Sequence, residues 1–284
     1  MKVRKCIIPI AGKGTRFLPI TKTVSKEMLP IVNEPTIMLL VKECLKSGIE
    51  EIIFVVGEHN HNLIKSFFSK NLELEEFLGN DEKKKALLDD VNEIIEKIKF
   101  HYVFQDENVR GTAGAIYAAR EYIEDEYFGV MFGDDIIDSE VPVLKQLIEE
   151  HEKHNCNVIG VGEVPDELIQ NYGIVKYANE NIVADFIEKP KLEEAPSNHA
   201  LHGRLVLNSK LLSEVLNCTK HSNNEYYIPE LLRNSDEELR AVKYDGTYYD
   251  IGSHVGYIKA NIAYGLKKES IKKDLVEFIK NIGE

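Results

Sequence analysis

Short apolar segments that alternate with helix-like segments constrain the fold of this 284-residue chain more than any other feature. Strand-like apolar runs lie at residues 6–11, 51–56, 100–104, 128–132 and 158–161. Apolar-faced helical patterns occupy intervals between and beside them, around 36–45, 60–69 and 140–154. Buried strands alternating with helices are typical of a doubly wound sheet with parallel central strands. We therefore predict a Rossmann-like α/β fold.

Three segments interrupt this alternation. Residues 70–98 are rich in Glu, Lys and Leu, which predicts a helical insertion. Residues 174–177 and 182–187 are strand-like and flank a turn at 179–181, which predicts a hairpin and makes the sheet mixed. The chain from His254 onward has the pattern of one or two helices. No linker composition marks a boundary, so we expect one domain spanning residues 1–284.

Composition excludes several classes of partner and site. The formal net charge of −13 argues against nucleic acid and against an anionic membrane surface. No run of about 18 apolar residues and no signal peptide is present, so we expect no membrane association. Four scattered cysteines without a C-x-x-C pair indicate a reducing, cytoplasmic setting. Two H-x-x-H pairs lack a third ligand, so we expect no zinc site.

A basic glycine loop follows the first strand. Residues 1–30 sum to a charge of +6 in this acidic chain, and they include Gly12, Lys13, Gly14, Arg16 and Lys26. Glycines allow backbone N–H groups to approach a phosphate, and Lys and Arg add charge. The loop matches neither the G-x-x-x-x-G-K-[ST] pattern nor G-x-G-x-x-G. It therefore predicts a third kind of phosphate loop, with a glycine turn bearing a solvated basic face as the alternative.

Carboxylates follow two apolar segments. Asp134 and Asp135 come directly after the strand at 128–132, and Asp250 lies in a tight turn flanked by apolar residues. Carboxylates at a strand end can hold a divalent ion, although a helix N-cap or a solvated turn is the alternative. Together, the two motifs could clamp one Mg²⁺ against a triphosphate.

Two further motifs carry weaker predictions. Gln105 precedes the small-residue run at 111–115, which can pack against a flat base while the amide meets a pyrimidine edge. Tight packing of a helix start is the alternative. Glu188, Lys189 and Pro190 end the predicted hairpin, where Glu suits sugar hydroxyls and Lys a sugar phosphate. The two charged side chains point to opposite faces unless Pro190 breaks the pleat, and a surface pair is the alternative.

The order of these motifs resembles that of the bacterial nucleotidyltransferases that activate sugar 1-phosphates. The resemblance extends from about residue 3 to 265 and is strongest to the uridylyl branch. The shared segments include AGKGTRFLP at 11–19, KTVSKEMLPIVNEP at 22–35, LELEEFL at 72–78, GTAGA at 111–115, GDD at 133–135, YGIV at 172–175, IEKP at 187–190, APSNHALHGRLVL at 195–207 and DIGSHVGY at 250–257. KEMLP and APSN…GR are specific to that branch, whereas GxGTR and EKP are shared with thymidylyl, cytidylyl and guanylyl relatives.

The resemblance implies that UTP and glucose 1-phosphate give UDP-glucose and pyrophosphate by Mg²⁺-dependent in-line attack on the α-phosphate. It divides the chain into a nucleotide-binding part (1–135), a sugar-phosphate-binding part (136–253) and C-terminal helices (254–284). The implied catalytic residues are Arg16, Lys26 and Lys189. A homodimer or homotetramer is also implied.

The individual roles that the resemblance implies fall into four groups. Ala11 and Gly12 would face the base through their backbone, and Gly14, Thr15 and Arg16 would hold the β- and γ-phosphates. Gln105 and Gly111 would recognise uracil. Lys26 would stabilise charge on the α-phosphate. Mg²⁺ would bind Asp134 and Asp250. Glucose would contact Gly173 and Glu188, and its phosphate Lys189.

Two departures keep other functions open. His254 stands where the uridylyl branch often has lysine, and GTAGA also resembles guanylyl and thymidylyl relatives. The alternatives are a thymidylyl- or other nucleotidyltransferase, a glycosyltransferase that uses GDD to hold its metal, and a non-catalytic regulatory relative. The absence of a Ser/His/Asp constellation fits a reaction whose nucleophile is already an anion.

Overall fold

The computed structural model describes residues 2–124, 126–221 and 223–282. Its main sheet has the strand order β10-β9-β11-β6-β1-β4-β5, with β8 paired to β11 and β12 paired to β8. β6, β1, β4 and β5 run parallel, while β11 runs antiparallel to β6, so the predicted mixed sheet is confirmed. The strands are β1 (Lys5–Pro9), β4 (Glu51–Val56), β5 (Lys99–Phe104), β6 (Tyr127–Met131), β8 (Asn157–Glu163), β9 (Gly173–Tyr177), β10 (Val183–Glu188), β11 (His199–Asn208) and β12 (Leu239–Lys243).

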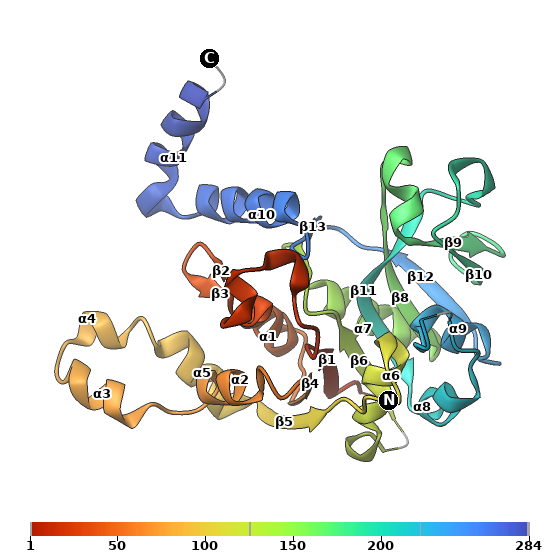
Figure 1. Cartoon of the computed structure of the whole chain (residues 1–284), viewed down its shortest axis with the longest axis horizontal. Helices are drawn as coiled ribbons and strands as arrows, with labels where there is room; N and C mark the ends of the chain where they lie inside the picture. The colour runs from red at the N-terminus through yellow and green to blue at the C-terminus, as the bar shows by residue number, and fades with distance from the viewer. Residues whose placement is uncertain (1, 125, 222, 283–284) are drawn as a thin grey trace.

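Helices cover both faces of this sheet (Figure 1). On β4, Ile52 and Phe54 face a core shared with α1 (Thr36–Lys46) and α7 (Val143–His154). The alternate residues Ile53 and Val55 face a second core with α6 (Gly111–Ala118), α8 (Lys210–Glu214) and α9 (Ile228–Arg233). Because β4 is buried on both faces from Ile52 to Val56, this part of the strand is continuously apolar rather than alternating.

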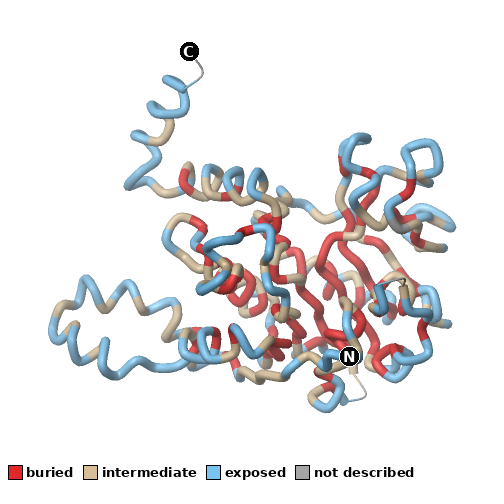
Figure 2. The backbone as a smooth tube through the Cα atoms, in the orientation of Figure 1, coloured by how far each residue is buried: buried red, intermediate tan, exposed pale blue. Residues whose placement is uncertain are grey.

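The predicted insertion is helical. It consists of α3 (Leu72–Leu78), α4 (Glu82–Lys85) and α5 (Asp89–Lys97), and it follows α2 (His61–Phe67). α5 is anchored to the first core by Ile94, whereas α3 and α4 extend away from the sheet (Figure 1). Their surface is largely exposed (Figure 2).

Two short strand pairs, a hairpin and several 3₁₀ turns complete the fold. β7 (Asp135–Asp138) pairs antiparallel with β13 (Thr247–Asp250), and β2 (Pro30–Ile31) pairs with β3 (Glu34–Pro35). The predicted hairpin is confirmed as β9 and β10. The 3₁₀ turns are η1 (Thr15–Phe17), η2 (Ile20–Lys22), η3 (Lys26–Met28), η4 (Arg120–Tyr122), η5 (Asp166–Asn171), η6 (Leu192–Glu194) and η7 (Val215–Asn217).

The chain ends in two helices, α10 (His254–Lys267) and α11 (Glu269–Ile282). α11 packs on α10, has no buried residue and points away from the sheet (Figure 1). Over the part of the chain that the structure describes, no helix is both long and apolar enough to cross a membrane.

Candidate active site

The glycine loop after β1 folds against Lys26. Gly14 has φ +59°, and a Cβ there would lie 3.2 Å from Cβ of Lys26, so both backbone and packing favour glycine. The Thr21 hydroxyl donates to the Gly14 carbonyl oxygen at 2.8 Å and fixes the turn. At Gly12, a Cβ would lie 4.0 Å from Nζ of Lys26. The predicted loop and the predicted lysine are therefore neighbours, and Ala11 and Thr15 lie in the same segment.

Lys26 is held between two acidic side chains. Its Nζ donates to Oδ2 of Asp134 at 2.8 Å and lies 3.9 Å from Oε1 of Glu27. Burial opposes the charge of Lys26, but Asp134 and Glu27 outweigh it and raise the lysine pKa. Burial alone would raise the pKa of Asp134, but the charges of Lys26 and Arg16 lower it. Both groups are therefore charged at neutral pH.

Asp134 and Asp250 converge although they are far apart in the sequence. A Cβ built on Gly252 would lie 3.1 Å from Oδ2 of Asp134 and 3.0 Å from Oδ1 of Asp250, so these oxygens are at most about 6 Å apart. The β7–β13 pairing produces this convergence, because it sets Asp250 opposite Asp135. Arg16 reaches the same point, where its Nη1 donates to the Gly252 carbonyl oxygen at 3.4 Å. Burial and the charge of Asp134 raise the pKa of Asp250.

This pair of carboxylates fits a magnesium ion whose remaining ligands come from water and from substrate phosphates. Within the described ranges, no three His, Cys, Asp or Glu side chains gather closely enough to hold a metal by themselves. Mg²⁺ is commonly held by one or two carboxylates together with water and substrate phosphates. The Lys26 ammonium forms an ion pair with Asp134, so a cation already occupies a position next to this carboxylate.

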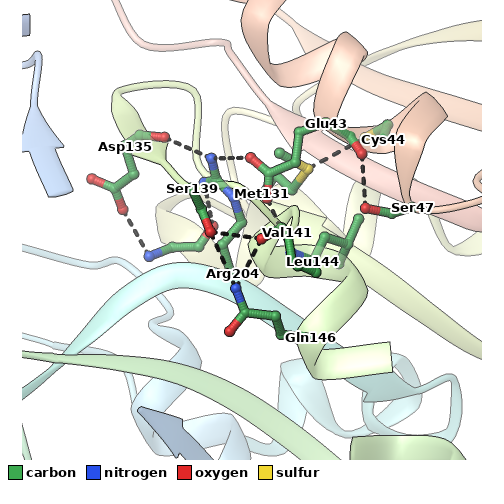
Figure 3. A network of polar contacts seen from close by, with 11 residues as sticks. Glu43, Cys44, Ser47, Met131, Asp135, Ser139, Val141, Leu144, Gln146 and Arg204 are labelled. Atoms are coloured by element: carbon green, nitrogen blue, oxygen red, sulfur yellow. Dashed lines mark hydrogen bonds and ion pairs between the residues drawn. The ribbon is translucent and has the colours of Figure 1, made fainter. Parts of the chain in front are cut away.

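Asp135, the second acid of the GDD motif, has a different environment. It is buried and accepts hydrogen bonds from the Tyr248 hydroxyl and the Gly203 amide, both at 2.7 Å. Burial and the nearby Asp134 raise its pKa to about 6. The fully buried Arg204 donates to the Asp135 carbonyl oxygen and makes two bonds to the Glu43 carboxylate (Figure 3). This network ties β7, β11 and α1 together beneath the converging carboxylates.

A cleft of about 850 Å³ adjoins this cluster. Five predicted residues line it: Arg16, Gly173, Lys189, Asp134 and Asp250. The other predicted residues are not among the described residues that line it. Lys26 and the glycine loop border it through the Lys26–Asp134 contact.

Sequence reasoning missed several residues of this cleft. Lys259 lines it from α10, one turn after Val255, and adds a cation. Four tyrosines, Tyr172, Tyr227, Tyr248 and Tyr249, also line it. Helical spacing from the DIGSHVGY motif could have identified Lys259, because residues four apart share a helix face.

The end of the hairpin places Lys189 in the cleft. Lys189 has φ +48°, a left-handed conformation that is uncommon outside glycine, and its amide donates to the Tyr172 carbonyl oxygen at 3.0 Å. The strand therefore ends at Glu188, which stands opposite Gly173 in the sheet. The Glu188 side chain lies outside the described residues.

Gln105 and Gly111 are adjacent at the start of α6. The Gln105 amide donates to the Gly111 carbonyl oxygen at 3.2 Å. Gly111 has φ +92°, and a Cβ there would lie 2.2 Å from the Tyr226 carbonyl oxygen. Close packing therefore explains this glycine, and base recognition by the pair stays a prediction.

Comparison with known proteins gives consistent matches over almost the whole chain. A "UTP--glucose-1-phosphate uridylyltransferase 2" from Staphylococcus saprophyticus is 41% identical, with 99% of this chain and 98% of that protein covered. A crystal structure of a UDP-glucose pyrophosphorylase complexed with UDP-glucose is 35% identical with a TM-score of 0.84, covering 94% of this chain and all of that one. A UTP-bound UGPase from Acinetobacter baumannii is 30% identical with a TM-score of 0.87, covering 98% of both chains.

The family model described as "Nucleotidyl transferase" matches residues 5–266. That range contains the glycine loop, both converging aspartates and the hairpin that carries Lys189. By this match and by its full-length relatives, the chain belongs to the nucleotidyl transferase family.

Proposed function

We propose that this chain transfers a uridylyl group from UTP to glucose 1-phosphate and releases UDP-glucose and pyrophosphate. The observation that carries the proposal is the convergence of Asp134, Asp250 and Arg16 beside Lys26, in one cleft with Lys189. Relatives named for this activity, and neighbours solved with UTP and with UDP-glucose, support it. The cleft volume lies in the range typical of small-molecule sites.

The cations of the cleft have separate tasks in this proposal. Gly14, Thr15 and Arg16 hold the β- and γ-phosphates, and Lys26 stabilises charge on the α-phosphate. Lys189 binds the phosphate of the sugar, while Gly173 and Glu188 contact glucose. Ala11 and Gly12 face the base, and Gln105 and Gly111 recognise uracil.

Asp134 and Asp250 would hold Mg²⁺, which when bound neutralises charge on the transferring phosphate and orients it. The chain's own residues supply the rest. A phosphomonoester oxygen is largely deprotonated at neutral pH, since its second pKa is about 6, so no general base is required. The difficult task is to align two polyanions, and alignment can contribute roughly 7–11 kcal/mol. Lys26, Arg16 and Lys189 offset the repulsion during this alignment.

The test is a matrix of nucleoside triphosphates and hexose 1-phosphates incubated with purified protein and Mg²⁺. We expect pyrophosphate and UDP-glucose in equal amounts from UTP and glucose 1-phosphate. A preference for dTTP would favour the thymidylyl alternative. In a parallel reaction that supplies UDP-glucose as the donor, release of free UDP would favour a glycosyltransferase. No turnover in either assay would leave a regulatory relative.

Further parts of the proposal concern the molecule as a whole. A homodimer or homotetramer is supported by exposed apolar side chains on α11, such as Phe278 and Ile282. Size-exclusion chromatography with light scattering would test it. A cytoplasmic location is supported by four free, buried cysteines. Treating residues 1–284 as one domain is supported by a sheet that combines strands from the proposed nucleotide part and sugar part.

A further inference from the structure

A buried carboxylate beside Lys26 has no task in the proposed reaction. Glu27 lies in η3 with an exposed fraction of 0%. Its Oε2 accepts a hydrogen bond from the Ser25 hydroxyl, and Ser25 in turn lies next to the buried Asn60. Its Oε1 is buried without a hydrogen-bond partner among the described residues. That oxygen lies 3.9 Å from Nζ of Lys26.

Lys26 and a metal ion would compete for the same anion. The Lys26 ammonium now donates to Oδ2 of Asp134, one of the two carboxylates that would hold Mg²⁺. A divalent ion on Asp134 would repel the neighbouring ammonium, so the N–H group that Lys26 now donates to Asp134 needs another acceptor. Because an ammonium has three donors, Lys26 can bond a second carboxylate and still reach the α-phosphate. Among the described residues, Glu27 is the one other carboxylate within ion-pair distance of Lys26 Nζ.

We propose that Glu27 is a positioning residue that receives the Lys26 ammonium when Asp134 binds the metal. The side-chain oxygen that lacks a partner in the present arrangement becomes the acceptor in the loaded one. Lys26 thereby stays charged and close to Gly12 of the glycine loop, where the triphosphate is proposed to bind. This inference rests on the proposed function, because that function requires a metal on Asp134.

The surroundings of Glu27 support this role over simple packing. The Ser25 bond and the Asn60 contact restrain the side chain and leave Oε1 on the side of Lys26. Burial raises the pKa of Glu27 to about 7, against the opposing effect of Lys26. A closer approach by the Lys26 ammonium would stabilise the charged form of the Glu27 carboxylate further. The charged carboxylate would in turn attract the ammonium more strongly.

The test compares the Mn²⁺ affinity of Glu27→Gln with that of wild type. Mn²⁺ is titrated into each protein in the absence of substrates, and its binding is monitored by electron paramagnetic resonance. Glutamine keeps the size of the side chain and an oxygen for Ser25 but removes the charge that receives Lys26. We expect Mn²⁺ affinity to fall about 10-fold or more, as for other residues that support metal ligands. We also expect kcat to fall more than KM rises. Glu126→Gln is the matched control, because it removes a carboxylate 2.7 Å from Lys5 at the start of β1.

Equal Mn²⁺ affinity in wild type and Glu27→Gln would overturn the proposal. Should the variant fail to fold, a wild-type crystal structure with Mn²⁺ and UTP decides instead. We expect the distance from Lys26 Nζ to Glu27 to shorten to about 2.8 Å, the length of a direct charged hydrogen bond. A lysine still bonded to Asp134 beside the metal would contradict the proposal. Mn²⁺ binding needs no turnover, so a wild type that makes no UDP-glucose would overturn the proposed function separately.

Discussion

Replacing Gly252 with alanine should impair the metal site while leaving the fold intact. The new Cβ would lie 3.0 Å from Oδ1 of Asp250 and 3.1 Å from Oδ2 of Asp134, closer than such contacts normally are. Gly252 does not have a positive φ, so its backbone accepts alanine. Each carboxylate must therefore move away by roughly 0.3 Å. Since a misplacement of 1 Å can cost about 100-fold in rate, a shift of 0.3 Å costs about 4-fold on a logarithmic scale. Two displaced ligands then predict about a 20-fold loss of kcat/KM.

The assay is pyrophosphate release at varied Mg²⁺ concentration, together with thermal unfolding. We expect the Mg²⁺ concentration for half-maximal rate to rise and the melting temperature to stay nearly constant. Gly48→Ala provides the converse control, because Gly48 has φ +82° and a Cβ there would have no neighbour within 4 Å. That variant should lose about 1 kcal/mol of stability through backbone strain and keep its kcat/KM. A folded Gly252→Ala protein with wild-type Mg²⁺ dependence would refute the proposed geometry.

Three further predictions address charge. Lys26→Ala should lower kcat about 100-fold to 1,000-fold with little change in KM, because its charge is needed most in the transition state; steady-state kinetics showing a raised KM alone would contradict this. Arg204→Met should cost about 3–5 kcal/mol in urea denaturation, because it strands the Glu43 carboxylate, and adding Glu43→Met should recover part of that loss. A double variant no more stable than the single one would refute it. Burial and the charge of Arg204 hold the pKa of His202 at about 4, below its ordinary value of 6.5, so the unfolded chain binds this proton first and the contribution of His202 to stability should fall by about 3 kcal/mol from pH 6.5 to 4. His202→Gln removes this contribution, so its stability relative to wild type should rise by about that amount over the same range, and a pH-independent difference would contradict the assignment.

Most of the parallel half of the sheet was predictable because β1, β4 and β6 are largely buried and therefore mostly apolar. β5, at the edge of the sheet, is only partly buried, but its aromatic residues and Val103 still give a strand-like pattern. Each of the four strands appears near its predicted position. β11 was missed, although it is the ten-residue strand on which β6, β8 and β9 all pair. Its sequence carries His202 and Arg204, and only tertiary partners such as Glu43 make their burial possible. The local sequence around β11 does not indicate these partners, because they lie far away in the chain.

The sequence motifs predicted the groups of the candidate site and the pairing of its two aspartates, but not the elements that bring these groups together. Asp134 and Asp250 are brought together by β7 and β13, which are four-residue strands too short to give a pattern. Asp135 and Asp134 look equivalent in the sequence, yet the Tyr248 and Gly203 bonds engage only Asp135. The orphaned oxygen of Glu27 depends on packing around Lys26, which no spacing rule encodes.

The most direct measurement is the position of Mn²⁺ in crystals grown with UTP, located by its anomalous scattering. The account predicts one peak within coordination distance of both Asp134 and Asp250, with the triphosphate against the glycine loop at Gly12 and Gly14. A peak remote from either aspartate, or a triphosphate bound away from that loop, would contradict it.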